Sequence, residues 1–165
     1  MFSESAKKLL ITKRIINTCI RSAPESTPMS INLLLHHLKS KTTKINDVDF
    51  DNLAFGSVYS DHMLVCDYKN GAWETPKIMP YQALTLDPAA KIFHYGQSIF
   101  EGMKAYKDAD GQPWLFRPLD NHKRLNISAK RLAIPEIPEE IFMDGLTTLL
   151  RLEKDWIPTT AGSSL

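Results

Sequence analysis

Apolar residues along the chain follow a strand-like pattern first and a helical pattern later. Residues 53–68 read as a strand, and Lys69-Asn70-Gly71 predicts a turn into a second short strand, so a β-hairpin is expected here. A second hairpin is predicted between residues 103–106 and 114–116, on either side of a turn at 108–113. Both predictions place the strands before residue 117.

Helices are expected after residue 120. Asp120 or Asn121 can cap the first, and Pro135 is expected to stop it. Its apolar face would carry Leu125, Ala129, Leu132 and Ala133. A second helix is predicted over residues 138–156, with proline in its first turn. Strands followed by helices predict an α+β domain, an antiparallel sheet with flanking helices.

Composition and charge indicate one folded domain behind an appended segment. The sequence has 165 residues and is 43% hydrophobic, enough for one core, and its apolar runs are far shorter than the roughly 20 residues that span a membrane. Residues 1–46 have a net charge of +6 and the remainder −5. We therefore expect a basic, poorly ordered or helical extension over 1–44, the domain over 45–158 and the start of a linker over 159–165.

The basic extension has two interpretations. Residues 1–28 are either a transit peptide for a mitochondrion or plastid, or a translated upstream stretch with the true start at Met29. Cys19 and Cys66 show no paired spacing, which favours a reducing compartment, and we expect a cytoplasmic location. Because the extension lacks interleaved aromatic residues, it gives little support for nucleic-acid binding.

The run over residues 94–106 has the composition of a pocket wall. Tyr95 and Phe100 are five residues apart and would point to opposite faces of a straight strand. They can line one pocket only if the chain turns between them, and Gly96-Gln97-Ser98 is suitable turn sequence. The run therefore predicts part of a binding site.

Several polar residues are candidates for chemistry, each with a structural alternative. The planar fork of Arg124 suits a phosphate dianion, although a solvated arginine is the commoner case. Lys104 is either a nucleophile or a surface lysine. Asp61 and His62 are either an acid–base pair or residues with a structural role. His94 either donates a hydrogen bond to a ligand or fixes the turn that follows it.

Read together, these segments resemble the branched-chain amino acid aminotransferases, which are fold type IV pyridoxal-phosphate enzymes. The resemblance rests on five stretches: residues 55–63, 94–106, 115–118, 121–131 and 154–158. It covers roughly residues 45–165 and indicates the small N-terminal domain of such an enzyme. D-amino acid aminotransferases and aminodeoxychorismate lyases share the fold but match the aromatic run and residues 155–158 less well.

The resemblance implies roles for individual residues. Arg124 matches the arginine that holds the phosphate of the pyridoxal 5'-phosphate cofactor. Phe55, Tyr95 and Phe100 match aromatics around the aliphatic side chain of leucine, isoleucine or valine, in a homodimeric enzyme that uses 2-oxoglutarate as amino acceptor. Lys104 matches a position at the mouth of the substrate site.

The resemblance also implies that the catalytic machinery is incomplete. In the family, the Schiff-base lysine and the carboxylate that pairs with the pyridine nitrogen lie in the second, larger domain. No catalytic residue is therefore expected among these 165, and the chain is expected to be inactive alone. The alternative is a non-catalytic remnant that acts as a dimerisation or interaction module.

Overall fold

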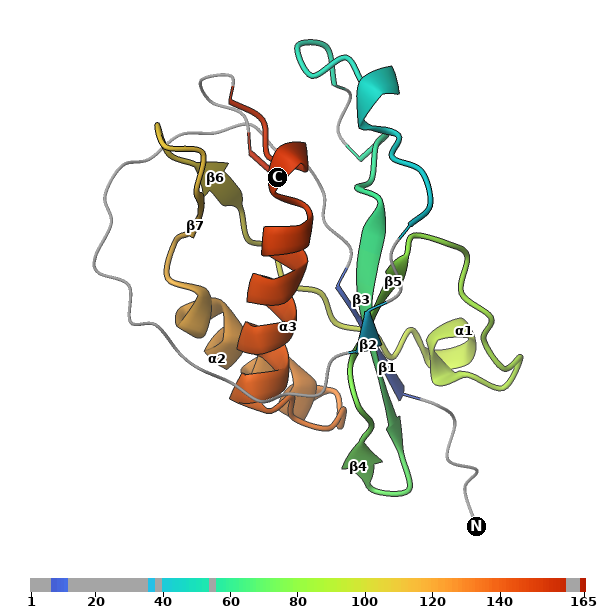
Figure 1. The fold of residues 1–165 in the computed structure, drawn as a ribbon. Helices are drawn as coiled ribbons and strands as arrows, with labels where there is room; N and C mark the ends of the chain where they lie inside the picture. Colours follow the sequence, from blue (N-terminus) through green and yellow to red (C-terminus); the bar gives the residue numbers. More distant parts are fainter. Residues whose placement is uncertain (1–6, 12–35, 38–39, 54–55, 160–163) are drawn as a thin grey trace.

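The computed structural model describes residues 7–11, 36–37, 40–53, 56–159 and 164–165. Its larger sheet has the strand order β1-β3-β5-β2, with β4 also paired to β3 (Figure 1). The strands are β1 (Lys7–Ile11), β2 (His36–His37), β3 (His62–Lys69), β4 (Ala72–Trp73) and β5 (Lys77–Pro80). All pairings are antiparallel except that of β2 with β5. The sheet confirms the expected α+β class.

Strand β3 is the centre of this sheet. It pairs with β1 on one edge and β5 on the other, where Leu64 faces Ile78. Residues 63–66 are all buried, so side chains on both faces of this strand are shielded from water. The strand begins at His62 rather than at residue 53, so the predicted start was too early. The backbone of Asp61 instead donates its N–H to a carboxylate oxygen of Glu153, outside any ladder.

Both predicted hairpins are present. Asn70 and Gly71 have φ values of 52° and 79°, the left-handed pair that a two-residue turn between twisted strands requires. The second hairpin joins β6 (Ala105–Lys107) to β7 (Pro113–Leu115). Its strands lie within two residues of the predicted positions.

The two 14-residue helices, α2 and α3, were both predicted, with errors at their ends. Helix α2 (Pro118–Arg131) starts earlier than expected, at a proline and without a side-chain cap from Asp120 or Asn121. It also ends earlier, and both Leu132 and Ala133 are exposed rather than part of the apolar face. Ala133 has a φ of 52°, so the helical path stops two residues before Pro135.

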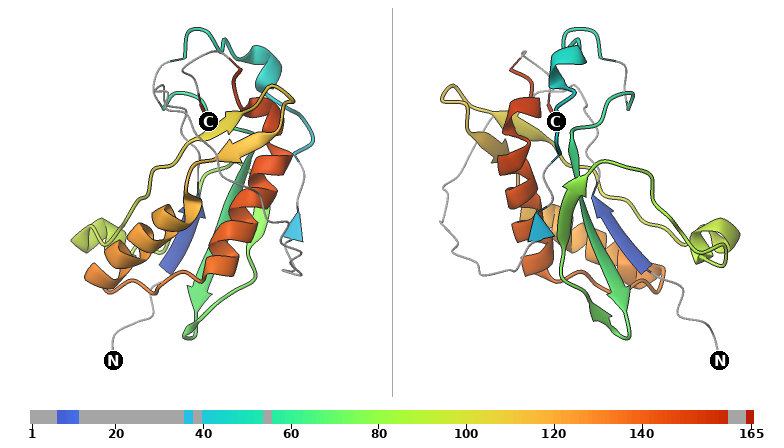
Figure 2. Two further views of the ribbon diagram at one scale, coloured as in Figure 1. Left: turned by 90° about the vertical axis from the view of Figure 1, so that its left-hand side faces the viewer. Right: turned by 45° about the vertical axis from the view of Figure 1, so that its right-hand side comes forward.

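Helix α3 (Glu139–Leu152) supplies much of the core. It was predicted over 138–156 with proline in its first turn, but Pro138 is its N-cap and the helix ends at Leu152, before the 3-10 turn η2 (Lys154–Trp156). Helices α2 and α3 lie on the same side of the sheet, as two views show (Figure 2). Gly145 brings the helix backbone against Leu64 of β3, since a Cβ built there would lie 2.5 Å from Leu64 Cδ2. Among the described residues, no helix is long and apolar enough to cross a membrane.

One helix was missed. Helix α1 (Lys91–Tyr95) lies on the opposite side of the sheet from α3 (Figure 1) and ends at Gly96, whose φ of 58° makes it a left-handed C-cap. The predicted change of direction after Tyr95 is therefore present, but as a helix end. Of the predicted 1–44 extension, the described residues include strands β1 and β2, and the turn η1 (Ile45–Asp47) follows.

Candidate functional site

The candidate site is formed by residues 96–104 and helix α2, which run alongside each other in opposite directions. At one end, the Gln97 side-chain amide donates to the carbonyl of Leu132, 2.7 Å away, just beyond the helix. At the other end, Asn121 donates to the carbonyl of Gly102 at 3.1 Å. These bonds to the backbone fix a loop without ladder partners onto a regular helix.

A charged cluster joins the two elements near the start of α2. The Glu101 carboxylate accepts hydrogen bonds from Arg124 Nε at 2.8 Å and from Arg124 Nη2. It also accepts from Asn121 Nδ2 at 3.0 Å and from the N–H of Gly102 at 3.1 Å. The Glu101 side chain is only 7% exposed, whereas that of Arg124 is 66% exposed. One carboxylate therefore gathers four donors and holds an arginine at the surface.

The electrostatics of this cluster follow from its hydrogen bonds. The bond from Arg124 lowers the pKa of Glu101, against the opposing effect of burial. The same contact raises the pKa of Arg124. Glu101 engages only the Nε and Nη2 edge of a five-donor guanidinium. The site can therefore hold an anion at the exposed remainder of the fork.

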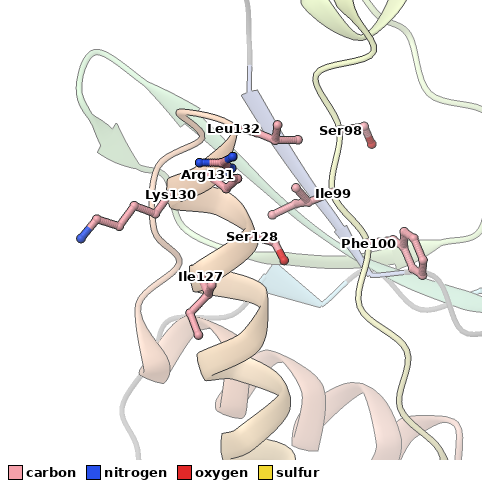
Figure 3. Close-up of a pocket in the computed structure, with 8 residues that line it drawn as sticks. All are labelled: Ser98, Ile99, Phe100, Ile127, Ser128, Lys130, Arg131 and Leu132. Atoms are coloured by element: carbon pink, nitrogen blue, oxygen red, sulfur yellow. The ribbon is translucent and has the colours of Figure 1, made fainter.

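The aromatic residues predicted to form the pocket wall are exposed. Tyr95 is 82% and Phe100 90% exposed, and no ring contact joins them in the described structure. Ile99 points towards α2 while Phe100 points away from it, as expected for alternating side chains of an extended segment (Figure 3). Phe55 lies outside the described residues. Tyr95 is the last residue of α1 and Phe100 lies on the following loop, and the two side chains do not line one enclosed pocket.

A groove of about 740 Å³ lies between this loop and the end of α2. It is lined by Ser98, Ile99, Phe100, Ile127, Ser128, Lys130, Arg131 and Leu132 (Figure 3). Arg124 is not among the lining residues. The structure therefore does not bring the predicted phosphate-binding residue and the aromatic residues predicted around the substrate side chain together in one pocket. Lys104 is partly buried beside β6.

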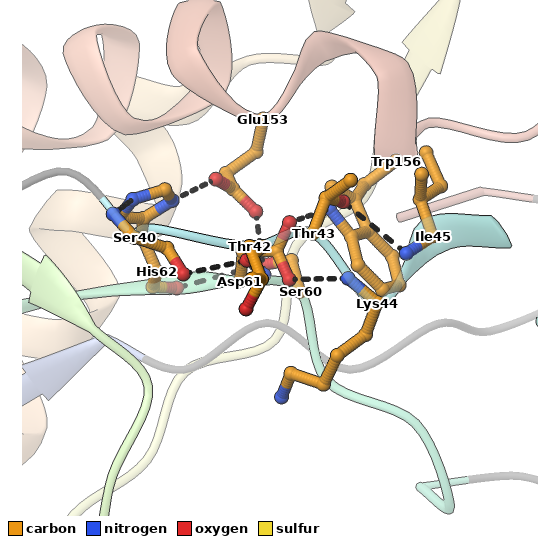
Figure 4. Close-up of polar contacts among 10 residues, drawn as sticks. All are labelled: Ser40, Thr42, Thr43, Lys44, Ile45, Ser60, Asp61, His62, Glu153 and Trp156. Atoms are coloured by element: carbon orange, nitrogen blue, oxygen red, sulfur yellow. Dashed lines mark hydrogen bonds and ion pairs between the residues drawn. The ribbon is translucent and has the colours of Figure 1, made fainter. Parts of the chain in front are cut away.

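A second polar cluster connects the start of β3 to the end of α3 (Figure 4). His62 Nδ1 lies 2.5 Å from Glu153 Oε1, and both side chains are almost fully buried. Since the N–H of Ser40 donates to His62 Nε2 at 2.8 Å, that nitrogen is the acceptor, and Nδ1 carries the proton donated to Glu153. The other Glu153 oxygen accepts the Asp61 N–H at 2.9 Å.

Asp61 and His62 therefore do not form the acid–base pair that the sequence suggested as one possibility. The Asp61 carboxylate instead accepts from Trp156 Nε1 at 3.1 Å and from the N–H of Lys44 at 3.1 Å. Burial raises the pKa of Asp61, but hydrogen bonds from Thr43, Lys44 and Trp156 outweigh it, so the net pKa is lowered. These contacts assign both residues a structural role.

His94 also serves the local fold. Its Nε2 lies 2.8 Å from the carbonyl of Pro88, across the chain that leads into α1. This contact corresponds to the structural alternative for His94. Within the described ranges, no group of three or more His, Cys, Asp or Glu residues could hold a metal ion.

Sequence reasoning missed the two residues that organise these clusters, Glu101 and Glu153. Their partners are 23 and about 90 positions away, at Arg124 and at Asp61 and His62. No local spacing relates residues so distant in sequence. The one available signal for Glu101 was a carboxylate inside an apolar, glycine-containing run.

Comparison with curated proteins relates the sequence of this chain to a known enzyme group. The chain is 50% identical over 118 residues to branched-chain-amino-acid transaminase 1 of Bacillus subtilis, covering 71% of the chain. It is 50% identical over 125 residues to branched-chain-amino-acid aminotransferase 2 of the same organism, and 44% identical over 122 residues to a Mycolicibacterium smegmatis branched-chain-amino-acid aminotransferase.

The extent of these matches differs between the chain and its relatives. They cover 71–75% of the chain but only 33–34% of each of these three relatives. No family model matches the chain. The chain is therefore related in sequence to the branched-chain aminotransferases and spans about one third of their length.

Proposed function

We propose that this chain supplies part of the cofactor and substrate site of a pyridoxal-phosphate-dependent branched-chain aminotransferase. The similarity of 50% over 71% of the chain carries the proposal. The geometry of Arg124 supports it, because the guanidinium is exposed and fixed to a loop of the predicted pocket wall. The substrates would be leucine, isoleucine or valine, with 2-oxoglutarate as amino acceptor.

The donor set fits the phosphate of the cofactor. Arg124 offers a permanently charged, planar fork, of which the exposed edge faces away from the bonds to Glu101. Arg124 would hold the phosphate, and the bound cofactor would supply an electron sink for the substrate carbanion. Tyr95 and Phe100, exposed in this chain, would exclude water from the aliphatic side chain once the remaining two thirds of a relative's length cover them.

A chimera tests this function. The chain would replace the corresponding third of the Bacillus subtilis transaminase 1, and amino transfer from leucine, isoleucine and valine to 2-oxoglutarate would be measured. We expect transfer from all three, and a raised KM for leucine after Phe100→Ala. A folded chimera without transfer would contradict the proposal.

Taken by itself, the 165-residue chain is proposed to lack transaminase activity. Mixing it with pyridoxal phosphate, reducing with borohydride and mapping by mass spectrometry should show no single lysine labelled in preference to the others. Selective labelling of one lysine, such as Lys104, would contradict this. The active enzyme is proposed to be a cytoplasmic homodimer, to be checked by fractionation and by light scattering of the chimera.

A second candidate function is that of a non-catalytic interaction module. It is favoured by the exposed aromatic residues around α1 and the following loop: Phe93, Tyr95 and Phe100 are 61%, 82% and 90% exposed. Stable dimers of the isolated chain, with a melting temperature that pyridoxal phosphate leaves unchanged, would support this function over the enzymatic one.

A further inference from the structure

The four donors around Glu101 distinguish it from an ordinary surface carboxylate. Its side chain is 7% exposed, and its oxygens accept from Arg124, from Asn121 and from the N–H of Gly102. Three of these donors belong to the helix and one to the loop, so the carboxylate is fixed by both elements. Arg124, by contrast, is 66% exposed and is held from one side only.

We propose that Glu101 is a positioning residue, which orients the Arg124 guanidinium for an incoming phosphate group. The inference rests on the proposed function, since it takes Arg124 as the phosphate ligand. The physical reason is entropy. An unrestrained arginine side chain has many rotamers and must be ordered when an anion binds. In this chain the two-bond contact with Glu101 fixes the plane of the fork beforehand.

Glu101 also has an opposing effect, because its negative charge lies next to the cation that would attract the phosphate. The bonds from Asn121 and Gly102 spread that charge over further donors. The anion would approach from the exposed edge of Arg124, on the side away from Glu101, where greater distance and bulk water weaken the repulsion. Orientation therefore outweighs repulsion, and removal of Glu101 should weaken phosphate binding.

The test is a titration of the 165-residue chain with inorganic phosphate at mildly alkaline pH, followed by the Arg124 Nε–Hε signal in 15N NMR. We expect the wild-type signal to shift and saturate. Glu101→Ala should weaken phosphate affinity roughly tenfold, because the side chain loses its preorganisation. Glu101→Gln keeps an acceptor oxygen at the same place without the charge, and should recover most of the affinity.

A matched control comes from the same helix. Asp120 pairs with Arg117 Nε at 2.5 Å, so Asp120→Asn removes a carboxylate–arginine contact without touching Arg124. This variant should bind phosphate at Arg124 as the wild type does. Circular dichroism melting of each variant separates loss of fold from loss of orientation, and Glu101→Gln stays informative if Glu101→Ala unfolds.

The outcomes separate the two proposals. Equal or tighter phosphate binding by folded Glu101→Ala, with the wild type binding normally, would overturn the role of Glu101 alone. Glu101→Gln binding as weakly as Glu101→Ala, with both folded, would also overturn it. A wild-type chain in which phosphate leaves the Arg124 signal unchanged would overturn the phosphate role of Arg124 and the Glu101 inference with it.

Discussion

At the scale of single residues, two glutamates whose side chains have little exposure hold together segments that are far apart in sequence. Glu153 receives the ring N–H of His62 and the backbone N–H of Asp61, and Glu101 receives the guanidinium of Arg124. Buried carboxylates are costly to desolvate unless donors surround them. Each glutamate meets that requirement, so removing either one leaves donors without their acceptor.

Glu153→Ala should strongly destabilise the fold. The substitution leaves the His62 and Asp61 donors buried and unpaired, which costs about 3 kcal/mol or more. Urea unfolding followed by circular dichroism measures the loss. The neighbouring Asp155→Ala is the control, because Asp155 is exposed and should change the free energy of unfolding by less than about 0.5 kcal/mol.

Asp61 should contribute a pH-dependent part of the stability. Because its pKa is lowered on folding, its contribution is present above the ordinary value of 3.8 and is lost as the pH falls through the lower pKa of the folded state. The free energy of unfolding of the wild type should therefore exceed that of Asp61→Asn at neutral pH, and the difference should shrink in acid. A difference that stays constant down to strongly acidic pH would contradict the assignment.

At the scale of elements, the hairpins and the two long helices could be predicted, since each is specified by local sequence. The first hairpin turn requires two residues in the left-handed conformation, which Asn and Gly adopt readily. The apolar residues of α3 repeat at helical spacing. Element ends were less predictable. Ala133 ends the helical path with a φ of 52°, which alanine rarely adopts and its sequence does not indicate. Helix α1 has only 5 residues, too few to show a helical repeat of apolar positions.

Gly145→Ala tests the contact between α3 and the sheet. Alanine normally favours a helix, but here the new methyl group would lie 2.5 Å from Leu64 Cδ2. We expect a loss of roughly 1–3 kcal/mol in the free energy of unfolding, from overpacking. A double-mutant cycle with Leu64→Ala should show favourable coupling, because the smaller residue makes room. Additive changes in the free energy of unfolding would contradict a steric contact between position 145 and Leu64.

At the scale of the whole molecule, the sequence predicted the enzyme group better than the arrangement of its site. The similarity to branched-chain aminotransferases is confirmed over 71% of the chain. The roles of Phe55, Tyr95, Phe100, Lys104 and Arg124 stay predictions. Tyr95 and Phe100 are exposed in this chain, and no local sequence pattern specifies which segment would cover them.

Cofactor affinity of the chimeric Bacillus subtilis transaminase, with and without Arg124, tests the central claim most directly. Arg124→Ala should weaken pyridoxal phosphate binding by about a hundredfold, since charge-assisted hydrogen bonds to the phosphate are lost. Lys123→Ala, which removes an exposed cation from the same helix outside the groove, should leave it unchanged. Equal cofactor affinity of the Arg124→Ala variant and the unmutated chimera would contradict the assignment of this chain to the cofactor site.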